Sequence, residues 1–192
     1  MLKINLKTFI YAVFTVVIMA VYSPSYATKI AYINSFYVMD NSNSWKNFKG
    51  KIKNHALEVQ KIVIEREKKI EKIWQKIKTM RDEKGNVNEI DKMEKQFQKE
   101  SIALQKYVER QKKQMDKEFL AGKNKIQDKI ISIAKKIVKE EKIDILMNVG
   151  DFSFNSAVLY AKDELSLTEK VLNVLNKSNL KLNLNLDKGS IK

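Results

Sequence analysis

The chain has no cysteine, only one histidine, His55, and only one proline, Pro24. Without cysteine it can form no disulfide, no thiolate metal site and no thiol nucleophile. A single imidazole is too few for the usual zinc sites, so His55 is interpreted as an ordinary residue of a helix surface. We therefore expect no catalytic residue, no metal and no cofactor, and an enzyme is the class that the composition favours least.

The first 27 residues have the organisation of a secretory signal peptide. Two early lysines precede an uncharged, mostly apolar run of 14 residues at positions 8–21. Pro24 follows, and then a Ser-Tyr-Ala triplet that ends at Ala27, with small residues where a signal peptidase reads, so cleavage is expected after Ala27. The alternative is a retained anchor, but a membrane span needs about 20 apolar residues. Export separates the chain from nucleic acid, so no nucleic-acid partner is expected despite the basic composition.

Residues 45–142 contain no proline and predict a long antiparallel helical hairpin that turns at residues 85–88, Gly-Asn-Val-Asn. Apolar residues in the first arm recur at alternating steps of four and three, which is the signal of a coiled coil. The second arm becomes mostly polar at residues 105–117, so we expect irregular packing near residues 105–119. The first-arm seam consists of Ile52, Ala56, Val59, Val63, Ile70, Ile73, Ile77 and Met80, with Arg66 as its one polar member.

Folding the hairpin about Asn86 predicts which residues face each other. Trp74 should meet Phe97 near the tip, and Gly50 should lie opposite Gly122. A glycine inside a helix costs about 1 kcal/mol relative to alanine. Two glycines at one level therefore indicate a hinge or a close approach at the base of the hairpin, although chance placement stays open.

The positive charge of the chain is concentrated on the hairpin. Residues 46–142 carry 28 Lys and Arg against 16 Asp and Glu, whereas residues 28–45 and 143–192 are each balanced. Some of these charges will form helix-stabilising pairs four residues apart. The excess favours an electrostatic role, namely attraction of acidic polypeptides or of an anionic membrane surface.

Several apolar residues lie off the seam, where a hairpin of two helices cannot bury them. They must contact other copies of the chain or remain exposed as an adhesive surface. Together with Phe97, they are the candidate residues for binding another polypeptide: Leu57, Ile62, Ile64, Trp74, Ile102 and Val108.

The two segments that flank the hairpin, residues 28–44 and 143–177, are expected to form a small β-rich body. A core of this size is thin for one chain, so oligomerisation is expected. The predicted elements are strands at residues 29–34, 143–149 and 157–161 and a helix that follows a capping box at residues 166–169.

A short helix and a turn should lead from the first strand into the hairpin. Ser35 can open the helix, and residues 40–44 form a turn cluster of Asp, Asn and Ser. Ser44, or Asn43 before it, is then expected to cap a helix that starts at Trp45.

The last segment, residues 178–192, is expected to be a tail. Leucine occupies every second position from Leu180 to Leu186, which places four leucines on one face of an extended chain. Such a segment predicts either an edge strand, added to the body or to a neighbouring subunit, or a frayed end.

The order of these elements resembles the Skp (OmpH-like) family of periplasmic chaperones. The resemblance covers roughly residues 29–177 and rests on the flanking segments: Lys-Ile-Ala-Tyr-Ile-Asn at 29–34, Ile-Asp-Ile-Leu-Met-Asn at 143–148, Ala-Val-Leu-Tyr-Ala at 157–161, and Leu167-Thr168 before Val171-Leu172. Ser166 stands where relatives often carry Asp, but both residues cap helices. The tail after Lys177 extends beyond the usual end of the family.

The resemblance implies an α+β protein in which a long coiled-coil hairpin, or tentacle, projects from a small β-rich trimerisation body. It further implies a homotrimer whose three hairpins surround a cavity and hold unfolded outer-membrane polypeptides without ATP. A lipopolysaccharide site is proposed for some members of the family, but no motif of this sequence matches it. No residue of this chain is therefore assigned to lipopolysaccharide binding. The expected function is thus a periplasmic holdase, and the alternative is a coiled-coil scaffold or adaptor of the cell envelope.

Overall fold

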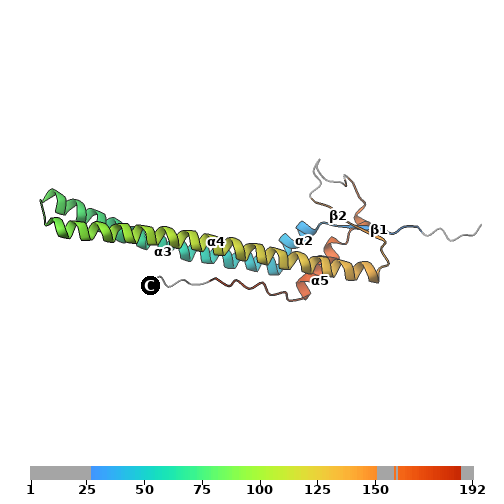
Figure 1. The fold of residues 1–192 in the computed structure, drawn as a ribbon. Helices are drawn as coiled ribbons and strands as arrows, with labels where there is room; N and C mark the ends of the chain where they lie inside the picture. The colour runs from blue at the N-terminus through green and yellow to red at the C-terminus, as the bar shows by residue number, and fades with distance from the viewer. Residues whose placement is uncertain (1–26, 151–157, 159, 187–192) are drawn as a thin grey trace, which may run out of the picture.

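The computed structural model describes residues 27–150, 158 and 160–186, and the predicted signal peptide lies almost wholly outside these residues. The described chain is mostly helical, with a long hairpin at one end and a small body at the other (Figure 1). The order of its elements is β1 (Ile30–Ile33), α2 (Ser35–Asn41), α3 (Asn43–Asp82), α4 (Val87–Glu140), β2 (Ile145–Asn148), a 3₁₀ turn η1 (Asp163–Leu165) and α5 (Thr168–Lys177).

Helices α3 and α4 run side by side in opposite directions and form the hairpin (Figure 1). The 40 residues of α3 span about 60 Å at 1.5 Å per residue. At the tip, Lys84 adopts a positive φ of 52° and the amide of Gly85 donates to the carbonyl of Met80 at 2.8 Å. The side chain of Asn86 accepts from the amide of Asn88 at 2.9 Å and caps α4. The chain therefore turns at residues 83–86, two residues earlier than predicted, because Val87 and Asn88 already belong to α4.

The body contains a two-stranded parallel sheet. β1 pairs with β2 in a register that runs from Ile30 opposite Ile145 to Ile33 opposite Asn148. Parallel strands need a crossover connection, and here the entire hairpin supplies it. Of the predicted third strand, residues 157 and 159 lie outside the described residues, and Val158, Tyr160 and Ala161 are not in a strand.

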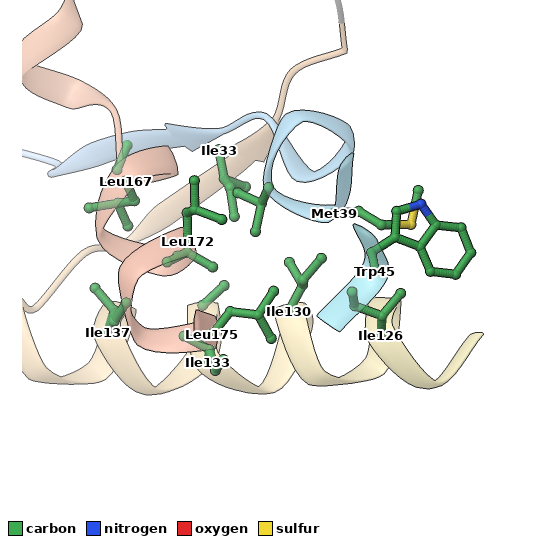
Figure 2. Close-up of a cluster of buried hydrophobic side chains, with 14 of the residues drawn as sticks. Ile33, Met39, Trp45, Ile126, Ile130, Ile133, Ile137, Leu167, Leu172 and Leu175 are labelled. Carbon is green, nitrogen blue, oxygen red and sulfur yellow. The ribbon is translucent and has the colours of Figure 1, made fainter. Parts of the chain in front are cut away.

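The hydrophobic core joins the body to the base of the hairpin. Isoleucines of α4 face α5, β1 and α2, and Trp45 of α3 closes the cluster on the hairpin side (Figure 2). Because α4 supplies one wall of this core, the hairpin is anchored in the body. The labelled core residues are Ile33, Met39, Trp45, Ile126, Ile130, Ile133, Ile137, Leu167, Leu172 and Leu175.

Two predicted helix starts are wrong, for reasons of local and tertiary hydrogen bonding. α3 begins at Asn43, and its cap is Ser42, whose fully buried hydroxyl donates to the carbonyl of Met39 at 2.7 Å and accepts from the amide of Trp45 at 3.3 Å. One serine therefore ends α2 and starts α3, which leaves no separate turn cluster.

The predicted capping box before α5 does not form. The hydroxyl of Ser166 accepts from the amide of Thr168, at 3.3 Å, and not from the amide of Glu169. The amide of Leu167 donates to the carbonyl of Tyr32 at 2.8 Å, and the hydroxyl of Thr168 accepts from the amide of Asn34 at 3.0 Å. These bonds tie the start of α5 to β1, and sequence neighbours alone could not reveal them.

The described part of the tail is neither an edge strand of the body nor a frayed end, and its pairing with a neighbouring subunit stays a prediction. Residues 180–186 form no strand, yet they are not frayed, because Leu182 is 4% exposed and belongs to the core cluster. From the end of α5 the tail runs along the hairpin in the direction of the tip (Figure 1).

Candidate functional site

Apolar side chains remain exposed along the hairpin, as the off-seam positions predict. Ile62 and Phe97 are half-buried, whereas the other five predicted binding residues are exposed. The exposed residues are Leu57 (47%), Ile64 (42%), Trp74 (42%), Ile102 (52%) and Val108 (41%). The structure thus leaves these side chains available, but it does not gather all seven into one site.

The ring of Trp74 meets that of Phe97 near the tip, as predicted, with the centroids 5.6 Å apart. The two rings border a shallow groove whose apolar floor includes Ile70 and Leu104. Glu67 and Glu71 lie on the α3 side of this groove. Such a groove can take up an apolar side chain of another polypeptide, because its own aromatic surface is only partly covered.

A second shallow depression surrounds Ile102 on α4. It is lined by Lys95, Lys99 and Lys106, together with Gln98 and Ala103. The lining shares no residue with the Trp74 groove. Here an apolar contact is framed by positive charge, which suits a segment that carries both apolar and acidic side chains.

A polar layer interrupts the apolar contact between the arms. Nε2 of His55 lies 2.9 Å from Oε1 of Gln111, which is only 1% exposed. The guanidinium of Arg66 stacks 5.3 Å from the centre of the Tyr107 ring. The interpretation of His55 as an ordinary surface residue is therefore wrong, because it is half-buried between the arms and pairs with a side chain that only the fold brings near. α4 remains continuous through this layer.

The two glycines lie in different surroundings. A Cβ on Gly122 would fall 2.4 Å from Cε1 of Phe48, so the ring packs directly on the glycine backbone. A Cβ on Gly50 would meet nothing within 4 Å. Both glycines lie inside continuous helices, and a hinge at this level stays a prediction.

Most of the positive charge of the hairpin has no ion-pair partner within the described residues. Of its 28 basic side chains, four make such pairs. Arg81 joins the arms by pairing with Glu94, and Lys95 pairs with Asp91 within α4. At the base, a hydrogen bond from Lys170 lowers the pKa of Glu141 from its ordinary value of 4.5. Most of the remaining basic side chains are exposed and present a positive surface to solvent.

An apolar groove on the body was not predicted from the sequence. It is lined by residues of β1, α2, α4 and β2, and its rim includes Phe36 (55% exposed) and Ile131 (51% exposed). Ile131 could have been found, because it falls off the seam of the isoleucines at 126, 130, 133 and 137. Phe36 could not, since its exposure depends on how α2 lies against α4.

Within the described part of the chain, no cluster of three or more His, Asp or Glu side chains could hold a metal ion. Among the same residues, no helix combines the length and apolar character needed to cross a membrane.

The comparison with protein families matches residues 29–175 to the family described as Outer membrane protein (OmpH-like). The chain belongs to the OmpH-like family. Among curated proteins, no match is found. A crystal structure from Caulobacter crescentus CB15, described as a candidate outer membrane chaperone (OmpH-like), superposes with a TM-score of 0.74 at 11% identity, over 86% of this chain and 94% of the other. At this identity the likeness shows a shared OmpH-like fold.

Proposed function

We propose that this OmpH-like protein is a periplasmic holdase that binds unfolded outer-membrane proteins without ATP and prevents their aggregation. Membership of the OmpH-like family and the likeness to a described outer membrane chaperone support this class of function. The observation that carries the proposal is the row of exposed apolar side chains on a long, basic hairpin. A globular protein with no such partner would have little reason to leave Trp74 and Ile102 partly bare.

The binding mechanism is avidity. Each shallow groove offers one weak apolar contact, and several such contacts on one flexible client add up because the first contact raises the local concentration for the next. The positive surface attracts acidic client segments or an anionic membrane surface over a range of about 8–10 Å at physiological salt. No single residue needs high affinity in this mechanism.

The proposed assembly is a homotrimer whose bodies meet and whose hairpins surround the client. The apolar groove of the body, with Phe36 and Ile131 on its rim, supports this arrangement, because it is too apolar to favour exposure to water. Gly50 and Gly122 remain the proposed positions at which the hairpins flex.

Aggregation assays test the client surface. Replacing Trp74, Ile62 and Ile102 together by serine should raise the light scattered by an unfolded outer-membrane protein after dilution from denaturant, while the mass of the assembly stays unchanged. The control is Val87→Ser, which removes an apolar side chain that is 78% exposed at the tip but lies outside both grooves. Full protection by the triple variant would contradict the assignment of these residues, and no protection by the unaltered chain would favour a scaffold.

A further inference from the structure

The tail lies along the base of the hairpin and contacts both α3 and α4. A cavity remains between the tail and Asn47, Phe48 and Lys51 of α3. Leu182 is 4% exposed, and the neighbouring alternate leucines, Leu180 and Leu184, pack against the same core cluster. The described tail therefore lies on the protein as an extended segment whose leucines face inward.

Hydrogen bonds from the hairpin also hold the backbone of this segment. Nζ of Lys51 donates to the carbonyl of Leu182 at 3.4 Å, and Nζ of Lys125 donates to the carbonyl of Lys181 at 3.2 Å. The carboxylate of Glu118 accepts from the amide of Asn185 at 3.1 Å. Both α3 and α4 contribute to these bonds. Backbone carbonyls and amides occur in every polypeptide, so the bonds select an extended chain without selecting a sequence.

The side-chain pattern of the tail is also a general one. Apolar residues alternate with Asn and Lys from Leu180 to Leu186. Strands of outer-membrane barrels alternate in the same way, with one apolar and one polar residue in each pair. The tail therefore has the chemistry of an unfolded barrel strand.

From these contacts we propose that the surface of α3 and α4 at Asn47–Lys51 and Glu118–Lys125, on which the tail lies, is a binding site for an extended polypeptide with apolar side chains at every second residue. The tail is its tethered occupant, and a strand of an unfolded barrel protein displaces it. This inference rests on the proposed holdase function and adds a defined site to it. A tether raises the effective concentration of the tail to the millimolar range, so only a client that binds elsewhere on the hairpins as well can compete efficiently.

Photo-crosslinking in the full-length protein tests the exchange. A benzoylphenylalanine in place of the exposed Asn47 should crosslink to residues 180–186 in the protein alone. With a saturating unfolded outer-membrane barrel protein, at least half of the crosslinks should move to the client. The same probe at Val87, at the distant tip, should not crosslink to the tail in either condition. A crosslink that stays on the tail while the client is held in solution would overturn the proposal and leave the holdase function intact.

Peptide binding supplies a second measurement. A fluorescein-labelled peptide with the sequence of residues 179–187 should bind at least tenfold more tightly to the Leu182→Asn, Leu184→Asn double variant than to the unaltered chain, because the released tail no longer competes. The matched control, Asn183→Ala with Asn185→Ala, keeps the leucine face and should bind like the unaltered chain. A peptide of the same composition with consecutive leucines should bind at least tenfold more weakly. Equal affinity of the labelled peptide for the double variant and the unaltered chain would overturn the proposal.

Discussion

Adding a single methyl group at Gly122 should have the opposite effect on stability from adding one at Gly50. Both glycines lie inside long helices, so alanine in place of either one should stabilise its helix by about 1 kcal/mol. At Gly50 the new Cβ meets nothing within 4 Å, and the full gain should appear. Gly50→Ala is thus a matched control for the propensity effect.

At Gly122 the packing cost exceeds this gain. The new Cβ would lie 2.4 Å from Cε1 and 2.5 Å from Cζ of Phe48, distances that carbon atoms cannot sustain. The ring cannot move away easily, because Phe48 is 1% exposed and stacks on Trp45 with the centroids 5.5 Å apart. Overpacking of this kind costs about 1–3 kcal/mol, so Gly122→Ala should destabilise the protein by up to about 2 kcal/mol after the helix gain is subtracted.

Thermal unfolding followed by far-UV circular dichroism at one fixed protein concentration measures the difference. One kcal/mol corresponds to roughly 2–4 °C for a chain of this size, so Gly50→Ala should raise Tm and Gly122→Ala should lower it. In a Phe48→Leu background the ring is absent, and Gly122→Ala should lose most of its cost. A Gly122→Ala variant as stable as Gly50→Ala would refute the close contact between Phe48 and the backbone of α4.

Two further predictions concern polar pairs. Gln111→Leu should lower the free energy of unfolding by about 1 kcal/mol, because it leaves His55 without a hydrogen-bond partner. Adding His55→Leu should recover that loss. Equal denaturation midpoints for the single and double variants would contradict the pairing of His55 with Gln111. Lys170 lowers the pKa of Glu141 in the folded state, so the pair stabilises the fold above the unfolded value of 4.5 and the effect disappears as pH falls through the lowered folded value. The Tm of the unaltered chain should therefore exceed that of Glu141→Gln at neutral pH and converge with it in acid, and a constant gap at all pH values would exclude this linkage.

The hairpin could be predicted from the sequence because its signals are local and repeated. Apolar residues at helical spacing predict two long helices, and the Gly-Asn pair at 85–86 predicts the turn between them. Once the turn is known, the contact between Trp74 and Phe97 follows from counting along two helices of equal rise. The same counting placed Gly50 opposite Gly122, but it could not show that the ring of Phe48, two residues before Gly50, fills the space at only one of them.

The features that the sequence analysis missed depend on contacts between distant segments. The start of α5 is set by hydrogen bonds to β1 and Asn34, more than 100 residues earlier. The local pattern at residues 166–169 therefore predicted a capping box that does not form. The tail was predicted as an edge strand or a frayed end. Its alternating leucines indicate an extended chain, but they do not show which part of the protein that chain packs against. Its position depends on Lys51, Lys125 and Glu118, which no spacing rule connects to residues 180–186.

Native mass measurement tests the central claim most directly. We expect the protein alone to form a trimer. An unfolded outer-membrane barrel protein, diluted from denaturant, should add the mass of one client to that trimer without nucleotide. The same trimer mass with and without the client, while the client aggregates, would contradict the holdase function.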